Sequence, residues 1–441
     1  MRVRSSSQYP KKYGWLAIVT LIVLLQACGD NNDHFSSNGN PGGVGTNQTV
    51  KFTGSMLFVK DGNLLVLHGA DESVTQLTSN RSAAQPSVSH DGSTIAFELH
   101  KPGSDYSNLA TMPLAGGTVT PHTDNRLLCK CDPDKSGVFH YQFWAGNPIW
   151  SSDDKQIIYL SDFYKGGRAT PRINQTCPAF SIKDSIQDLA IVETPANARA
   201  LPAISSSGHA NPPKLLAWPY CYAGGDQDLS LRPGVSDTEI LFTGFRYVGS
   251  QNDLVAQVSV LIIPRGGGPY RVIQLSPPDP KILSLEPSWS PDGKYITYIR
   301  RENGQDNLYI MAVDAAIQNG IPNTLAGGGP EEYLLIGAAR AKYYTNTTYY
   351  DASHKLAEGI IGQPTWGDQN QLFFMEFRDN LFDLFLAKVK FTAPAPAASA
   401  TPGAAPTPTA TPPPGITLDG DPIQLTRNGI DGASRPVWLS A

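Results

Sequence analysis

The chain has 441 residues and a formal net charge of −5 at pH 7, with charges of both signs along its length. No basic stripe is present, so the sequence argues against a nucleic-acid partner. The 41 glycines and 36 prolines suit a fold of many short strands joined by turns. The length suffices for two average domains or for one large all-β architecture.

The N-terminal segment predicts export. Basic residues precede an apolar run from Trp15 to Leu25, which at ~1.5 Å per residue is too short to span a bilayer of ~30 Å and therefore favours a cleaved signal. The run ends in "LQAC" at Cys28, which resembles the lipobox of bacterial lipoproteins. An ordinary secretory signal is the alternative.

The lipobox resemblance implies a signal peptide over 1–27 and a lipid (palmitate) anchor on Cys28. Gly29 is not the Asp that favours inner-membrane retention, so the resemblance implies the outer membrane, with the chain facing the periplasm of a bacterial cell envelope. Residues 28–52 are then a flexible tether, and the folded domain covers 53–441.

Four cysteines follow, at Cys129, Cys131, Cys177 and Cys221. An even number in an exported chain predicts two disulfides. A metal site is the alternative, but C-x-C with two remote cysteines lacks the C-x₂₋₄-C spacing of zinc sites. Cys129 and Cys131 are too close to pair easily with each other, so each is expected to bond Cys177 or Cys221, and the pairing stays open.

A short motif, Pro followed two residues later by Trp or Val, recurs six times. The copies are Pro86/Val88, Pro148/Trp150, Pro233/Val235, Pro287/Trp289, Pro364/Trp366 and Pro436/Trp438. A polar turn and a β-type run follow each of the first five, as in "SPDGKYITYI" after Trp289. The uneven spacing is incompatible with a solenoid but compatible with four-stranded propeller blades whose loops vary in length.

The fourth copy predicts strands A to D at 287–290, 294–300, 307–313 and 332–336, and in the second blade strands C and D are expected at "DLAIVE" and "RALPAI" (199–204). The sixth copy lacks strands B to D, whereas the segment before the first copy supplies three strands without a strand A. The sequence therefore predicts an all-β, six-bladed β-propeller of four-stranded antiparallel blades, whose last blade joins a C-terminal strand A to N-terminal strands B to D.

The stretch "PSWSPDGKYITYI" followed by "NLYIMAVD" resembles the repeat of TolB-like six-bladed propellers. The resemblance covers residues from about 53 to the end, and it is specific for this propeller group but for no activity. TolB carries an α/β domain before its propeller, for which this chain has no room. Its role in the Tol-Pal system is therefore not carried over.

Blade topology assigns each loop to a face: B–C and D–A connections lie on one face, A–B and C–D on the other. All four cysteines fall in connections of the first face, where disulfides would form a cap. Six aromatic residues of the same face are expected to line a recognition surface, or alternatively to pack the cap: Trp144, Trp218, Tyr220, Tyr222, Tyr343 and Tyr344. The opposite face receives the Pro/Ala/Thr-rich segment 393–415, predicted to be disordered.

No catalytic motif is present. G-x-S-x-G, the P-loop and H-E-x-x-H are absent, and "DPDKSG" (132–137) has Phe143 where a calcium loop needs a Glu. We therefore predict no catalytic residue, no metal and no cofactor.

The expected function is that of a membrane-anchored envelope lipoprotein whose propeller serves as a protein-interaction or scaffolding module for an envelope protein partner. The alternative is a glycan-binding or carbohydrate-active, lyase-like propeller that uses the mouth of its channel. Convergent carboxylates or histidines with perturbed pKa values at the mouth would favour an enzyme, and an aromatic, uncharged surface would favour a binder.

Overall fold

A computed structural model describes fourteen stretches of the chain. These are 51–104, 106–127, 143–164, 189–204, 211–219, 226–248, 253–276, 278–302, 305–313, 332–336, 360–368, 370–378, 381–392 and 415–440. Within them the structure consists of strands and turns.

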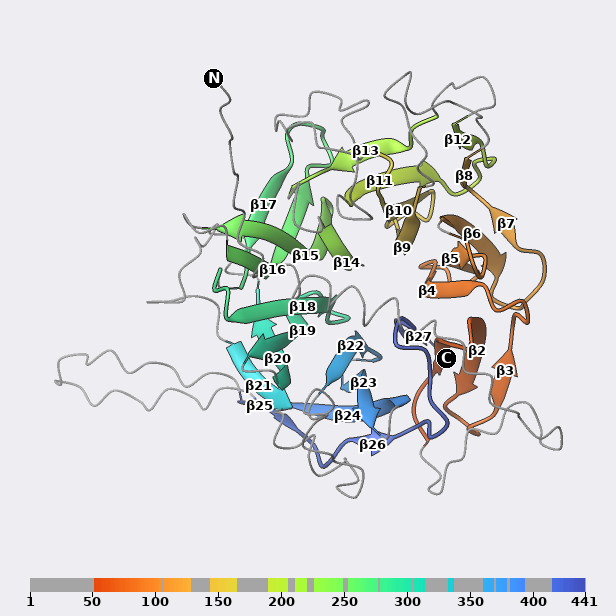
Figure 1. Cartoon of the computed structure of the whole chain (residues 1–441). Helices are drawn as coiled ribbons and strands as arrows, with labels where there is room; N and C mark the ends of the chain where they lie inside the picture. The colour runs from red at the N-terminus through yellow and green to blue at the C-terminus, as the bar shows by residue number, and fades with distance from the viewer. Residues whose placement is uncertain are drawn as a thin grey trace, which may run out of the picture.

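The sheets are arranged around a common centre (Figure 1). The innermost strand of each sheet contacts the innermost strands of its two neighbours, which closes a ring. These inner strands are β4 (Ala83–Val88), β9 (Ala145–Trp150), β14 (Asp226–Leu231), β18 (Ile282–Trp289), β22 (Ile361–Trp366) and β27 (Val437–Leu439). Apart from one separate two-stranded sheet, the described strands thus form the six blades of an all-β propeller, which confirms the predicted fold.

The outer strands pair antiparallel in chain order within each blade. Blade 1 adds β5 (Thr94–His100), β6 (Ser107–Pro113) and β7 (Thr120–Pro121) to β4. Blade 2 adds β10 (Gln156–Ser161), β11 (Ala190–Pro195) and β13 (Lys214–Ala217) to β9. Blade 3 adds β15 (Thr238–Val248), β16 (Asp253–Ile263) and β17 (Arg271–Gln274) to β14.

Blade 4 adds β19 (Tyr295–Glu302), β20 (Gln305–Ala312) and β21 (Glu332–Ile336) to β18. Blade 5 adds β23 (Gln371–Arg378), β24 (Leu381–Thr392) and two short strands that both pair with β24, β25 (Gly415–Leu418) and β26 (Ile423–Gln424), to β22. The closing blade adds β1 (Ser55–Lys60), β2 (Asn63–His68) and β3 (Val74–Gln76) to β27.

The closing blade joins the two ends of the described chain. Strand β27 pairs antiparallel with β1, with Trp438 opposite Met56. Gly54 allows this approach, because a Cβ at that position would lie 2.2 Å from the backbone oxygen of Leu439. The predicted closure by a C-terminal strand A is confirmed.

Two strand assignments made from the sequence were wrong. The third motif copy was placed at Pro233/Val235, but β14 ends at Leu231 and Pro233 lies in the turn beyond it. The outer strand of blade 2 was placed at 199–204, but that strand is β13. Instead, β12 (Pro202–Ile204) pairs in parallel with β8 (Asp124–Leu127), in a separate two-stranded sheet that follows blade 1.

The core consists of six buried clusters, each of which spans adjacent blades. The recurring tryptophans explain the motif, because each packs against the blade that precedes its own. Trp366 lies in the cluster of Ile299 and Leu308 and donates its indole N–H to Thr297 Oγ1 at 3.1 Å. In the four blades that carry the tryptophan, a large ring near the end of the inner strand thus fills the wedge between two sheets.

Candidate functional site

Five inner strands contain one residue in the left-handed backbone region, and the sixth, β27, begins two residues after such a residue, with φ between 46° and 55° in all six. These six inner-ring residues are Gln85, Asn147, Asp228, Glu286, Gln363 and Arg435. Non-glycine residues adopt this region rarely. In the five blades where pairing with strand B continues on both sides, the strand register shifts here, as at a β-bulge.

Inner-ring side chains accept backbone hydrogen bonds across the successive interfaces from blade 1 to blade 5. The backbone N–H of Asn147 donates to Gln85 Oε1 at 2.6 Å. The backbone N–H of Glu286 donates to Asp228 Oδ2 at 3.3 Å, and that of Gln363 donates to Glu286 Oε2 at 2.6 Å. Hydrogen bonds of this kind satisfy polar groups that would otherwise be buried without partners.

Blade 3 shows how the sequence adapts to this geometry. In the other five blades a proline, which has no N–H, follows the inner-ring residue. In blade 3 the following residue is Leu229, and its N–H donates to Asn147 Oδ1 at 2.8 Å. The missing proline made this motif copy hard to find, whereas the bulge and the interblade bond are kept.

Arg435 differs from the other five, because it crosses the centre of the ring. Its guanidinium donates to Asn147 Oδ1 and to the backbone oxygen of Leu229. These acceptors belong to blades 2 and 3, whereas the closing blade neighbours blades 1 and 5. The last inner strand is therefore linked to the far side of the ring.

Two carboxyl groups and one guanidinium share this central environment. Burial, and then the charge of Asp228, raises the pKa of Glu286 to about 8. Burial also raises the pKa of Asp228, although the positive charge of Arg435 acts in the opposite direction. The pKa of Arg435 is lowered to about 10 by burial, against the attraction of both carboxylates. The centre thus holds protonatable acids beside a desolvated cation.

The sequence did not identify the inner ring, because its members differ in charge and size. One common signal was present: five of the six stand directly before the motif proline, and all six are polar residues long enough to reach a neighbouring strand. Because sequence reasoning concentrated on the Pro and Trp positions, it overlooked the residue that precedes them.

Replacing Arg435 by Met is expected to lower the free energy of unfolding by about 3 kcal/mol at pH 8 to 9, because Asp228 and Glu286 lose their shared cation and Asn147 loses a donor. Urea unfolding followed by circular dichroism measures the change. Arg427→Met, at an exposed position, is the matched control and should change the stability by less than about 0.5 kcal/mol. Equal stability of both variants would contradict the interpretation of the inner ring.

Most of the predicted site residues lie outside the described residues. These are Cys28, Cys129, Cys131, Cys177, Cys221, Tyr220, Tyr222, Tyr343 and Tyr344. The lipid anchor, the two disulfides and most of the aromatic face therefore stay predictions.

Trp144 and Trp218 are described, and both pack against the protein. Trp218 is buried in the cluster between blades 1 and 2. Trp144 donates its indole N–H to Glu98 Oε1 at 3.0 Å, and its backbone N–H donates to Asp162 Oδ1 at 2.6 Å. Glu98 is 6% exposed, and burial raises its pKa to about 7.

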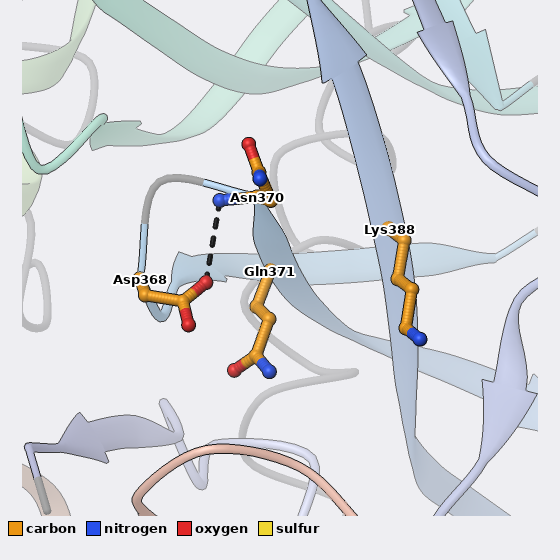
Figure 2. A pocket seen from close by; sticks show the side chains of 4 residues that line it. All are labelled: Asp368, Asn370, Gln371 and Lys388. Carbon is orange, nitrogen blue, oxygen red and sulfur yellow. Dashed lines mark hydrogen bonds between the residues drawn. The ribbon is translucent and has the colours of Figure 1, made fainter.

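A hollow of about 450 Å³ lies away from the inner ring, beside the A–B turn of blade 5 (Figure 2). Asp368, Asn370, Gln371 and Lys388 line it. In the described parts of the chain, no group of three or more His, Cys, Asp or Glu side chains is arranged to hold a metal ion. The same parts contain no helix of the length and apolarity needed to cross a membrane.

No protein-family model and no curated protein matches the sequence. Among solved structures, TolB from Acinetobacter baumannii is 14% identical, with a TM-score of 0.44 over 76% of this chain and 61% of that chain. An oligogalacturonate lyase from Vibrio parahaemolyticus is 13% identical, with a TM-score of 0.39 over 77% and 88%. The alignment spans about three fifths of the TolB chain, and these similarities concern the propeller fold alone.

Proposed function

We propose that the chain is a lipid-anchored protein of the bacterial cell envelope whose TolB-like propeller binds an envelope protein partner. The observation that supports this proposal is that the polar side chains of the inner ring are used in hydrogen bonds between blades. Side-chain oxygens of Gln85, Asn147, Asp228 and Glu286 accept N–H groups of adjacent blades, and Arg435 bridges the centre. These polar groups hold the disk together, which leaves its loop-bearing faces for recognition.

The face with the B–C and D–A connections is the proposed docking surface. Blade topology assigns to this face the connections that contain the four cysteines and the four predicted tyrosines, Tyr220, Tyr222, Tyr343 and Tyr344. Interfaces of this kind gain most of their affinity from a few aromatic anchors. The N-terminal tether joins β1 at the start of strand B, on the opposite face, so a membrane anchor would leave the docking face free.

A second candidate function rests on the acids at the centre. Asp228 and Glu286 lie together with raised pKa values, the feature that favours catalysis over simple binding. A glycan-binding or lyase-like activity at the mouth of the ring would use these groups to hold or transfer a proton. Asp228→Asn with Glu286→Gln would abolish such activity while leaving docking on the loops intact.

The experiment is cross-linking of the tagged full chain in intact cells, followed by purification and identification of attached proteins. Recovery of a specific envelope protein, retained by the Asp228→Asn, Glu286→Gln variant, is the expected result. Metabolic labelling with an alkyne fatty acid should mark the chain, and Cys28→Ser should remove the label and release the protein from membranes. Recovery of no protein partner, together with polysaccharide turnover that the double variant loses, would replace this proposal by the second.

A further inference from the structure

We propose that the A–B turn of blade 5 binds a sugar through adjacent hydroxyl groups. This site is independent of the inner ring and of the proposed docking surface. Gln371 lies between Asp368 and Lys388 at the hollow, whereas the side chain of Asn370 points the other way (Figure 2).

Three other blades show what this turn ordinarily contains. A serine follows their motif position, and its Oγ accepts the backbone N–H at the start of strand B at 3.0 Å: Thr94 N–H to Ser89, Gln156 N–H to Ser151, and Tyr295 N–H to Ser290. Each serine also donates to the Asp two residues later, at 2.6 to 2.8 Å. The serine side chain therefore fills the inside of the turn.

Blade 5 has Gly367 in place of this serine, and Gln371 occupies the space. A Cβ at Gly367 would lie 3.2 Å from Gln371 Oε1 and 2.8 Å from the ring of Phe373. As in the serine-containing turns, the backbone N–H at this position donates to the first residue of strand B, here from Gly367 N–H to the Gln371 oxygen at 2.8 Å. The Gln371 N–H has no serine Oγ to bond and donates to the Asp368 oxygen at 3.1 Å. Replacement of the serine thus puts a carboxamide at the hollow.

The carboxamide of Gln371 has unused hydrogen-bonding capacity. Gln371 is 8% exposed, and its Oε1 is buried with no hydrogen-bond partner among the described residues. Leaving a buried acceptor without a donor costs about 1–3 kcal/mol. A turn of the terminal carboxamide is needed to present this oxygen at the hollow, and a ligand that then donates a hydrogen bond to it recovers that free energy.

The neighbouring groups define what the ligand must offer. Lys388 is exposed and lies directly opposite Gln371 in the β23–β24 pair, so it supplies a cationic donor at the same place. Asp368 supplies a carboxylate whose Oδ1 accepts the backbone N–H of Asn370 at 3.3 Å. The carboxylate of Asp368 would repel a simple anion, and the ammonium group of Lys388 would repel a simple cation.

Hydroxyl groups meet both requirements, because each can donate and accept a hydrogen bond. Neighbouring hydroxyls of a sugar ring can donate to Asp368 and to Gln371 Oε1 while accepting from Lys388 and Gln371 Nε2. The volume of about 450 Å³ lies within the range of small-molecule sites. A sugar carboxylate would add an ion pair with Lys388, so neutral sugars and sugar acids share one chemistry but differ in their dependence on this lysine.

Isothermal titration of the full chain with galactose, galacturonate and the amino acid serine tests the proposal. Both sugars should bind and serine should not. Gln371→Met should weaken both sugars about tenfold, and Lys388→Met should weaken galacturonate about tenfold but galactose less than threefold. Lys390→Met, exposed on the same strand, and Gln76→Met, exposed on β3, are the matched controls and should leave both affinities unchanged.

Thermal unfolding of each variant checks its fold, and Asp368→Ala gives a second, independent loss of binding if Gln371→Met does not fold. Absence of sugar binding at tens of millimolar, unchanged affinity in both variants, or binding of serine in preference to the sugars would each overturn the proposal. None of these outcomes depends on recovery of a protein partner.

Discussion

Deletion of Ser434–Ala441 is expected to unfold the whole propeller. The deletion removes β27 and its pairing with β1, the crossing guanidinium of Arg435, and the Ser434 hydroxyl that accepts the backbone N–H of Val59 at 2.6 Å. Loss of the buried Leu439 side chain alone costs about 2–5 kcal/mol, the partly buried Trp438 and the lost hydrogen bonds add to this, and a domain has only about 5–15 kcal/mol in total. Circular dichroism melting should show loss of the cooperative transition.

Alanine at both Thr75 and Gln76 in β3, the outermost strand of the same blade, is the control for this deletion. Both side chains are exposed, so the double substitution should shift the melting temperature by only a few degrees. A truncated chain that melts as cooperatively as the full chain would show that the ring does not depend on its closure.

Glu98→Gln is expected to make the protein more stable at neutral and alkaline pH. Burial raises the pKa of Glu98 from its ordinary 4.5 to about 7, so the folded chain keeps a proton that the unfolded chain loses. The contribution of this group to the free energy of unfolding is fully present below about pH 4.5 and decreases as the pH rises from about 4.5 to about 7. Above about pH 7 it does not change further. A glutamine keeps the oxygen that accepts the Trp144 Nε1–H but cannot ionise. The free energy of unfolding of the variant should therefore be roughly 3 kcal/mol higher than that of the wild type at pH 8.

Urea unfolding of wild type and Glu98→Gln at pH 5 and pH 8 measures this effect. The difference between the two proteins should be small at pH 5 and largest at pH 8. Asp419→Asn, at an exposed position, should alter the stability by less than about 0.5 kcal/mol at either pH. A difference that does not change with pH would mean that Glu98 is ionised in the folded protein throughout this range.

The fold could be predicted because the six motif copies reflect a repeated packing requirement. Each tryptophan fills the wedge beside the preceding blade, and the incomplete sixth copy complements the three strands before the first copy. The outer strand of blade 2 was misplaced because "RALPAI" has the composition of a strand and does form one, but with β8. Composition alone does not specify which edge a short strand joins.

The inner-ring contact of blade 3 and the turn of blade 5 were beyond sequence reasoning for a different reason. Both depend on departures from the repeat, Leu229 in place of a proline and Gly367 in place of a serine, whose meaning lies in contacts with residues far along the chain. The N–H of Leu229 bonds to Asn147, 82 positions away. Equivalent positions in different blades can be compared only once the arrangement of the blades in the ring is known.

The pairing of β27 with β1 also has a consequence for how the protein is made. Val59 and Ser434 are 375 residues apart, so β1 has no inner partner until the intervening five blades have been synthesised. Contacts of such long sequence separation slow folding, and an unpaired strand edge invites association with other chains. The ring is therefore expected to close only after β27 has been synthesised, and until then the free edge of β1 in the nascent chain needs protection from aggregation.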